Sequence, residues 1–154
     1  MWPIFSGGSS RDLVNCFAYH EESGLLLVGG NTTSADFAPA ANDHGYIYAL
    51  DLDGNFMWGR FFYNVSYAIS DVSGCQIASD GSSLAVLAMG KSVPVVMEME
   101  ITKGTTKSFS SMEYFLTSDT VTPEYKTFGA VYYDARDSRD GRPYFYASFL
   151  MDDK

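Results

Sequence analysis

Two cysteines and two histidines are the first residues of this chain whose types could do chemistry. Cys16 and Cys75 can form a disulfide if their Cα atoms come within about 7 Å of each other, and two buried thiols are the alternative. They stand in comparable places, eight and six residues before the turn glycines Gly24 and Gly81. His20 and His44 are the only histidines, and neither stands at a zinc-ligand spacing. We therefore expect a bridge between the cysteines and no metal site.

Carboxylates gather in two predicted loops. The segment 51–55 is acidic, but it lacks the sixth-position glycine and the distant glutamate of an EF-hand loop, so we interpret it as a solvated turn. Asp134, Asp137 and Asp140 stand three residues apart and could hold Ca²⁺. Arginines alternate with them, and a solvated ion-pair network is the better interpretation. The alternating arginines are Arg136, Arg139 and Arg142.

Two triplets fit the N-glycosylation pattern Asn-x-Ser/Thr, one beginning at Asn31 and one at Asn64. Asn31 opens a polar stretch over 31–44 that we expect to be a long loop. Asn64 falls at an expected boundary between two structural units. A glycan would be exposed at both places, so we expect N-glycans on both residues.

The sequence contains no motif of a known catalytic machinery. A Gly-x-Ser-x-Gly elbow, a phosphate-binding loop and a dinucleotide fingerprint are all absent, and nothing singles out two carboxylates as a glycosidase pair. We expect a non-enzymatic protein with no catalytic residues and no cofactor.

Composition narrows the class of protein further. The 154 residues are 46% hydrophobic and 16% aromatic, which favours a globular, strand-rich domain. The net charge is −9 without any basic cluster, so we expect no nucleic-acid partner. No apolar run reaches the roughly 18 residues of a membrane span. The first residues lack the regions of a signal peptide, so we expect a processed or internal segment of a longer protein.

Turn glycines recur at intervals of the size of a four-stranded unit. Gly24, Gly81 and Gly141 lie 57 and 60 residues apart, and Gly54 and Gly104 lie 50 apart. Each follows an expected strand, and no window has the 3.6-residue period of a helix. The pattern predicts an all-β domain over 1–154, made of tandem four-stranded antiparallel blades and β-propeller-like, but incomplete at about two and a half blades. The expected blade-like units are 11–63, 72–115 and 127–154.

The residues that end the first unit carry a family resemblance. The segment 49–58, Ala-Leu-Asp-Leu-Asp-Gly-Asn-Phe-Met-Trp, resembles the hairpin of SBBP-type β-propeller repeats. It is also similar, with one residue fewer in the turn, to the tryptophan-docking motif of pyrroloquinoline-quinone-type propellers. In the second unit Ser108 occupies the place of Trp58. The resemblance implies a propeller scaffold, mostly found in secreted or surface proteins, in which Trp58 packs between blades.

Together these features predict a structural or interaction module of a secreted or cell-surface glycoprotein. A propeller that lacks blades exposes edges and apolar faces, so we expect assembly with copies of the chain, as an oligomer or filament, or with the remaining blades of a larger protein. The aromatic segment 144–150 is the expected exposed edge strand. The alternatives are a fragment of a propeller enzyme, quinoprotein-like or glycan-cleaving, and a carbohydrate-binding propeller.

Overall fold

A computed structural model describes residues 6–37, 43–62, 68–90, 93–111, 124–126, 131–134, 144–147 and 150–152. Every regular element among these residues is a β-strand, which confirms the predicted all-β class. No helix of the described part of the chain is long and apolar enough to cross a membrane.

The main body consists of two four-stranded antiparallel sheets, each with its strands in sequence order. The first sheet comprises β1 (Asp12–His20), β2 (Leu25–Thr32), β3 (His44–Leu50) and β4 (Phe56–Phe61). The second comprises β5 (Asp71–Ile77), β6 (Leu84–Gly90), β7 (Val93–Met99) and β8 (Thr106–Ser111). The connections 21–24, 51–55, 78–83 and 100–105 are four to six residues long, and short connections between antiparallel neighbours favour this simple up-and-down order.

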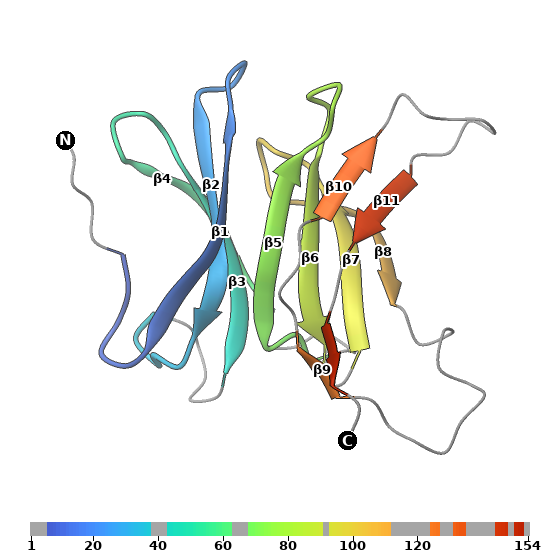
Figure 1. Ribbon diagram of the computed structural model, residues 1–154. Coiled ribbons are helices and arrows are strands. Elements are labelled where there is room, and N and C mark those ends of the chain that lie inside the picture. Colours follow the sequence, from blue (N-terminus) through green and yellow to red (C-terminus); the bar gives the residue numbers. More distant parts are fainter. Residues whose placement is uncertain are drawn as a thin grey trace.

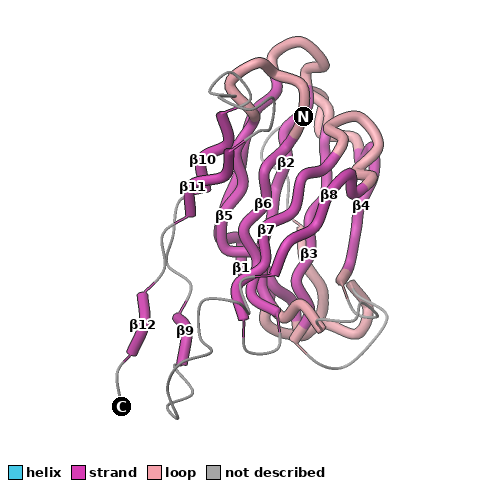
Figure 2. Tube along the Cα trace, turned by 90° about the vertical axis from the view of Figure 1, so that its right-hand side faces the viewer, coloured by secondary structure: helices cyan, strands magenta, loops and turns pink. Residues whose placement is uncertain are grey.

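Four short strands follow the second sheet and form two separate pairs. They are β9 (Glu124–Lys126), β10 (Val131–Asp134), β11 (Tyr144–Ala147) and β12 (Leu150–Asp152). β10 pairs with β11, and β12 pairs with β9. The single edge strand expected over 144–150 is therefore divided between two pairs, and its first half already has a partner. Figure 2 shows β9 and β12 lying apart from the two large sheets.

The two large sheets pack face to face, with β5 against β1, β2 and β3, and β10 lies on the other side of the second sheet against β5 and β6 (Figure 1). One core fills the space between the sheets. Its fully or nearly fully buried side chains are Leu27, Ile47 and Ala49 from the first sheet and Leu84, Val86, Ala88, Val95, Met97 and Met99 from the second. Alternate residues of β2 and β3 point into this core, as the two-residue period of a strand requires.

Matching bulges show which residues of the two sheets are equivalent. The register shifts between Val14 and Cys16 in β1, and between Val72 and Gly74 in β5. A second shift follows the turn before β4 in the first sheet and the turn before β8 in the second. Because bulges fix which residues face which side, the two sheets can be aligned residue by residue. Within that alignment Trp58 corresponds to Ser108, as the sequence predicted.

The long loop expected over 31–44 is shorter in the structure. Asn31 and Thr32 belong to β2, where Thr32 pairs with Asp12 on one side and His44 on the other. The Thr32 hydroxyl also donates to the Asp12 carboxylate. Polar residues can extend a strand when their neighbours satisfy their hydrogen bonds, and composition alone does not reveal that satisfaction.

Candidate interaction site

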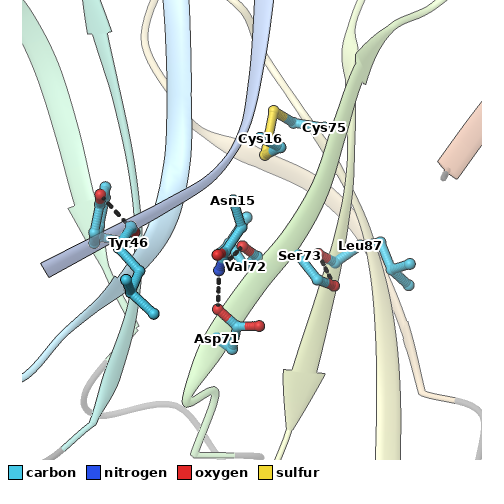
Figure 3. The surroundings of a disulfide bond; sticks show 9 residues. Asn15, Cys16, Tyr46, Asp71, Val72, Ser73, Cys75 and Leu87 are labelled. Atoms are coloured by element: carbon cyan, nitrogen blue, oxygen red, sulfur yellow. Dashed lines mark hydrogen bonds between the residues drawn. A yellow bond between two sulfur atoms is a disulfide. The ribbon is translucent and has the colours of Figure 1, made fainter. Parts of the chain in front are cut away.

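The structure joins Cys16 and Cys75 in a disulfide that links the first strands of the two large sheets (Figure 3). Their Cα atoms lie 5.7 Å apart, within the usual range for a bridge, and 59 residues separate them along the chain. Beside the bridge, Asn15 Nδ2 donates to Asp71 Oδ1 at 2.6 Å and to the Val72 carbonyl at 3.2 Å. The bulge at Asn15 turns this side chain towards β5, so covalent and hydrogen bonds join the same pair of strands.

The two cysteines are not equivalent positions, although the sequence suggested comparable places. Cys16 directly follows the bulge of β1, whereas Gly74 directly follows the bulge of β5. Cys75 therefore corresponds to Phe17. Equivalent residues of stacked sheets point the same way, so two equivalent cysteines could not meet. The offset of one residue is what turns the two sulfur atoms towards each other.

Trp58 holds the end of the first sheet on the hairpin between β7 and β8. Its side chain is 7% exposed, and its Nε1 donates to the Ile101 carbonyl at 2.9 Å. The indole covers Gly104, where an added Cβ would lie 2.5 Å from Trp58 Cζ3. Gly104 also has a φ of +63°, which side chains other than glycine's rarely adopt. Glycine is therefore required at position 104 both by the positive φ of the turn and by the space that the indole occupies.

Arg60 strengthens the same contact two residues further along β4. Its Nε donates to the Gly104 carbonyl at 3.0 Å and its Nη2 donates to the Lys103 carbonyl at 2.8 Å. Hydrogen bonds from a charged donor are stronger than those from a neutral one. Trp58 and Arg60 therefore dock β4 on one turn of the next sheet, and no pattern in the sequence predicted the role of the arginine.

The opposite, outward face of the first sheet carries a cluster of aromatic rings. Phe37, from the segment after β2, stands edge-on to Tyr46 and Phe61, with ring centroids 5.4 and 5.5 Å away. Tyr46 stacks on Tyr48 at 5.7 Å, and its hydroxyl donates to the Leu13 carbonyl at 2.9 Å. Burial, together with nearby acidic groups, raises the pKa of Tyr46. This part of the face is dry and filled by the chain itself.

Around these rings lie large apolar side chains of which about half or more of the surface is exposed, and we call them the open face. They are Val14 (58% exposed), Phe17 (74%), Tyr19 (49%), Leu52 (60%) and Phe56 (64%). They come from β1, from the turn between β3 and β4, and from the start of β4. Contiguous exposed apolar patches on soluble proteins mark interaction surfaces more often than single exposed residues do.

In the second sheet, the residues equivalent to Val14, Phe17, Tyr19 and Leu52 are covered by the first sheet, whereas Thr106, the equivalent of Phe56, is exposed. Val72 corresponds to Val14 and has no exposed surface, and Ile101 corresponds to Leu52 and is 3% exposed. Cys75 and Ile77, which correspond to Phe17 and Tyr19, pack against the core between the sheets. The open face is thus the surface that, one sheet later, receives a neighbouring sheet.

A polar cluster ties the segment before β1 to the end of β2. Asp12 accepts hydrogen bonds from the Gly8 amide at 2.7 Å, from the Ser34 hydroxyl at 2.9 Å and from the Thr32 hydroxyl. Desolvation alone would raise the pKa of Asp12, but these hydrogen bonds outweigh it and lower the pKa below its ordinary 3.8. The cluster has satisfied partners and fixes the chain's entry into the first sheet.

We expect this cluster to make folding sensitive to acid. A carboxyl whose folded pKa is below its unfolded pKa stabilises the fold above the unfolded value, and the contribution is lost as the pH falls through the folded pKa. NMR titration of the side-chain carboxyl should therefore give Asp12 a midpoint below 3.8. In Asp12→Asn, the part of the acid destabilisation due to this group should vanish. A midpoint at or above 3.8 would contradict the assignment.

The remaining predicted site residues lie apart from one another. His20 is the last residue of β1 and is nearly buried; its Nδ1 lies 2.7 Å from the Ser23 hydroxyl, and it lines an open hollow of about 490 Å³ beside Glu21 and Glu22. His44 begins β3 and is buried. The Asp51 carboxylate accepts from the Asn55 amide and side chain, both at 2.8 Å, and these bonds lower its pKa. This supports the turn interpretation of 51–55.

Two further predictions concern glycans and metal ions. Asn31 lies in β2 and is half-buried, on the side of the strand that faces the second sheet. Asn64, Asp137 and Asp140 lie outside the described residues. Within the described part of the chain, no three His, Cys, Asp or Glu side chains are grouped so that they could hold a metal ion.

Comparisons with known proteins give no relatives. No family model, no curated protein and no solved structure matches this chain. The geometry of the sheets is therefore the basis for any statement about function.

Proposed function

We propose that this chain is a non-enzymatic structural and interaction module of a secreted or cell-surface glycoprotein, and that its sheets are the blades of an incomplete, β-propeller-like array. The observation that carries the proposal is the open face. It presents Phe17 and Tyr19 to solvent, whereas their counterparts in the second sheet, Cys75 and Ile77, pack against the core between the sheets. In a repeat array each unit contacts its neighbours through equivalent sides. The outward side of the first sheet is therefore suited to bind a further unit.

The disulfide supports the proposed location. Bridges form and persist mainly in oxidising compartments, and Cys16–Cys75 joins two sheets that are otherwise held by packing and hydrogen bonds. The acidic surface, at a net charge of −9, keeps such a module soluble in the presence of apolar patches. Association with partner chains through the open face is the activity that this combination of features favours.

Glycosylation tests the location directly. We expect protein from its native source, or from a eukaryotic secretory host, to lose mass on endoglycosidase treatment at Asn31, Asn64 or both. Because Asn31 is half-buried in β2, we expect Asn64 to carry the larger share. Intact-mass measurement of the wild type, with Asn31→Gln and Asn64→Gln as controls for each site, gives the distribution. An unchanged mass in all three would overturn the glycoprotein assignment.

A further inference from the structure

The packing between the two large sheets has a direction. The side of the second sheet that carries Leu84 and Val86 receives the first sheet, whose inner side carries Leu25 and Leu27. In the alignment set by the bulges, Leu84 corresponds to Leu26, which lies on the outward side of the first sheet. This contact therefore joins two different sides: the inner kind, which carries Leu25 and Leu27 in the first sheet, and the outward kind, which carries Leu26 there. Units that stack through two different sides all have the same orientation, and we call such a stack a column.

The two ends of this column differ. One end is the outward side of the first sheet, with its open face. At the other end β10 lies against β5 and β6, as β5 lies against β1 and β2 (Figure 1). Both sides of the second sheet are buried, with Leu87 and Val86 fully inaccessible on opposite sides. In both large sheets the inner kind of side, which carries Leu25 and Leu27 in the first sheet, is already in contact with the unit that follows. The next side of this inner kind along the chain belongs to the β10–β11 end.

We propose that the open face binds a second copy of this chain head to tail, with the β10–β11 end of one copy packed on Phe17 and Tyr19 of the next. This inference rests on the proposed function and names the partner of its site. Contacts that join two different sides produce a ring if the rotation closes and a filament if it does not. A face-to-face dimer would join two sides of the same kind, unlike the contact between the two large sheets.

The chemistry of the open face suits this occupant. Its exposed aromatic and branched side chains give the large, rigid contact areas that dominate binding energy at protein interfaces. A net charge of −9 on each copy opposes association at low salt, and physiological salt screens that repulsion. We therefore expect association of the full chain to strengthen between low and physiological ionic strength.

Sedimentation velocity of the full, oxidised chain over a concentration series tests the proposal. The variant is Phe17→Asp, and the matched control is Phe109→Asp, an exposed aromatic of β8 that is 37% exposed. Wild type and Phe109→Asp should associate alike. Phe17→Asp should associate about tenfold or more weakly with itself. Circular dichroism and thiol alkylation of each variant check that the fold and the disulfide are retained.

A mixing experiment tests the head-to-tail geometry. Phe17→Asp keeps an intact β10–β11 end, so a fluorescently labelled sample should still co-sediment with excess unlabelled wild type while not associating with itself. If the labelled variant binds neither itself nor the wild type, the open face pairs with the open face of another copy, and the head-to-tail proposal is overturned. If Phe17→Asp associates like wild type, or Phe109→Asp is equally impaired, the site is overturned while the proposed function stands. A wild type that stays monomeric at every concentration and salt overturns both.

Discussion

Loss of the Cys16–Cys75 bond is expected to lower the free energy of unfolding by about 4 kcal/mol in the chain-entropy model. The bond closes a loop of about sixty residues in the unfolded chain, and the entropy that it removes there grows with loop length. Because a small domain has only about 5–15 kcal/mol of net stability, this loss should shift the transition strongly. Urea unfolding of Cys16→Ala/Cys75→Ala against the oxidised wild type measures the difference.

Two controls separate the covalent bond from its surroundings. Reduced wild type should unfold at nearly the same urea concentration as the double variant. Asn15→Ala removes the hydrogen bonds to Asp71 and Val72 but keeps the bridge, and should cost only about 1 kcal/mol. If the double variant and the oxidised wild type have the same midpoint, the bond contributes nothing and this account of it is wrong.

Truncation of Trp58 should destabilise the contact between the two sheets by about 3–5 kcal/mol, the range for removal of a buried indole. Trp58→Phe should cost less, since it keeps a ring over Gly104 and loses only the hydrogen bond to the Ile101 carbonyl. Thermal or urea unfolding of both variants gives the order. Equal effects of Phe and Ala would show that the ring does not bury Gly104 as described.

The partner of that ring offers the complementary test. Gly104→Ala should cost about 2–5 kcal/mol, because its Cβ strains a φ of +63° and also meets the indole. Gly54→Ala imposes the same kind of strain, at a φ of +84°, in the equivalent turn of the first sheet. It should cost only about 1–2 kcal/mol. The double variant Trp58→Ala/Gly104→Ala should lose less stability than the sum of the losses in the two single variants, as expected for residues in contact.

Local sequence signals predicted the strands and their turns well. Turn glycines such as Gly54 and Gly104 need a backbone conformation that few residues adopt, so they mark hairpins independently of what surrounds them. Trp58 could also be assigned a packing role, because a large ring after such a turn has few alternatives to burial. Strand order followed from the short connections. These features depend on residues close together in the chain.

Features that depend on distant neighbours could not be predicted in this way. The end of β2 at Thr32 relies on Asp12, twenty residues earlier, and the orientation of Cys16 relies on a bulge that no single residue signals. The open face was also missed, although Phe17 and Tyr19 alternate along β1 as one side of a strand would. Alternation shows that residues share a side, but only the packed structure shows that nothing in its described part covers Phe17.

The position of the disulfide also governs how the chain would carry a pulling force. Tension applied between the N-terminal and C-terminal parts of the chain passes through Cys16 and Cys75, which are 59 positions apart in the sequence, and bypasses the residues between them. Fully extended, that span would measure about 200 Å. While the bond is intact, this length is shielded and the first sheet's hairpins bear no load through their own backbone. Reduction of a single covalent bond would release it, so the redox state of the surroundings sets the extensibility of the module.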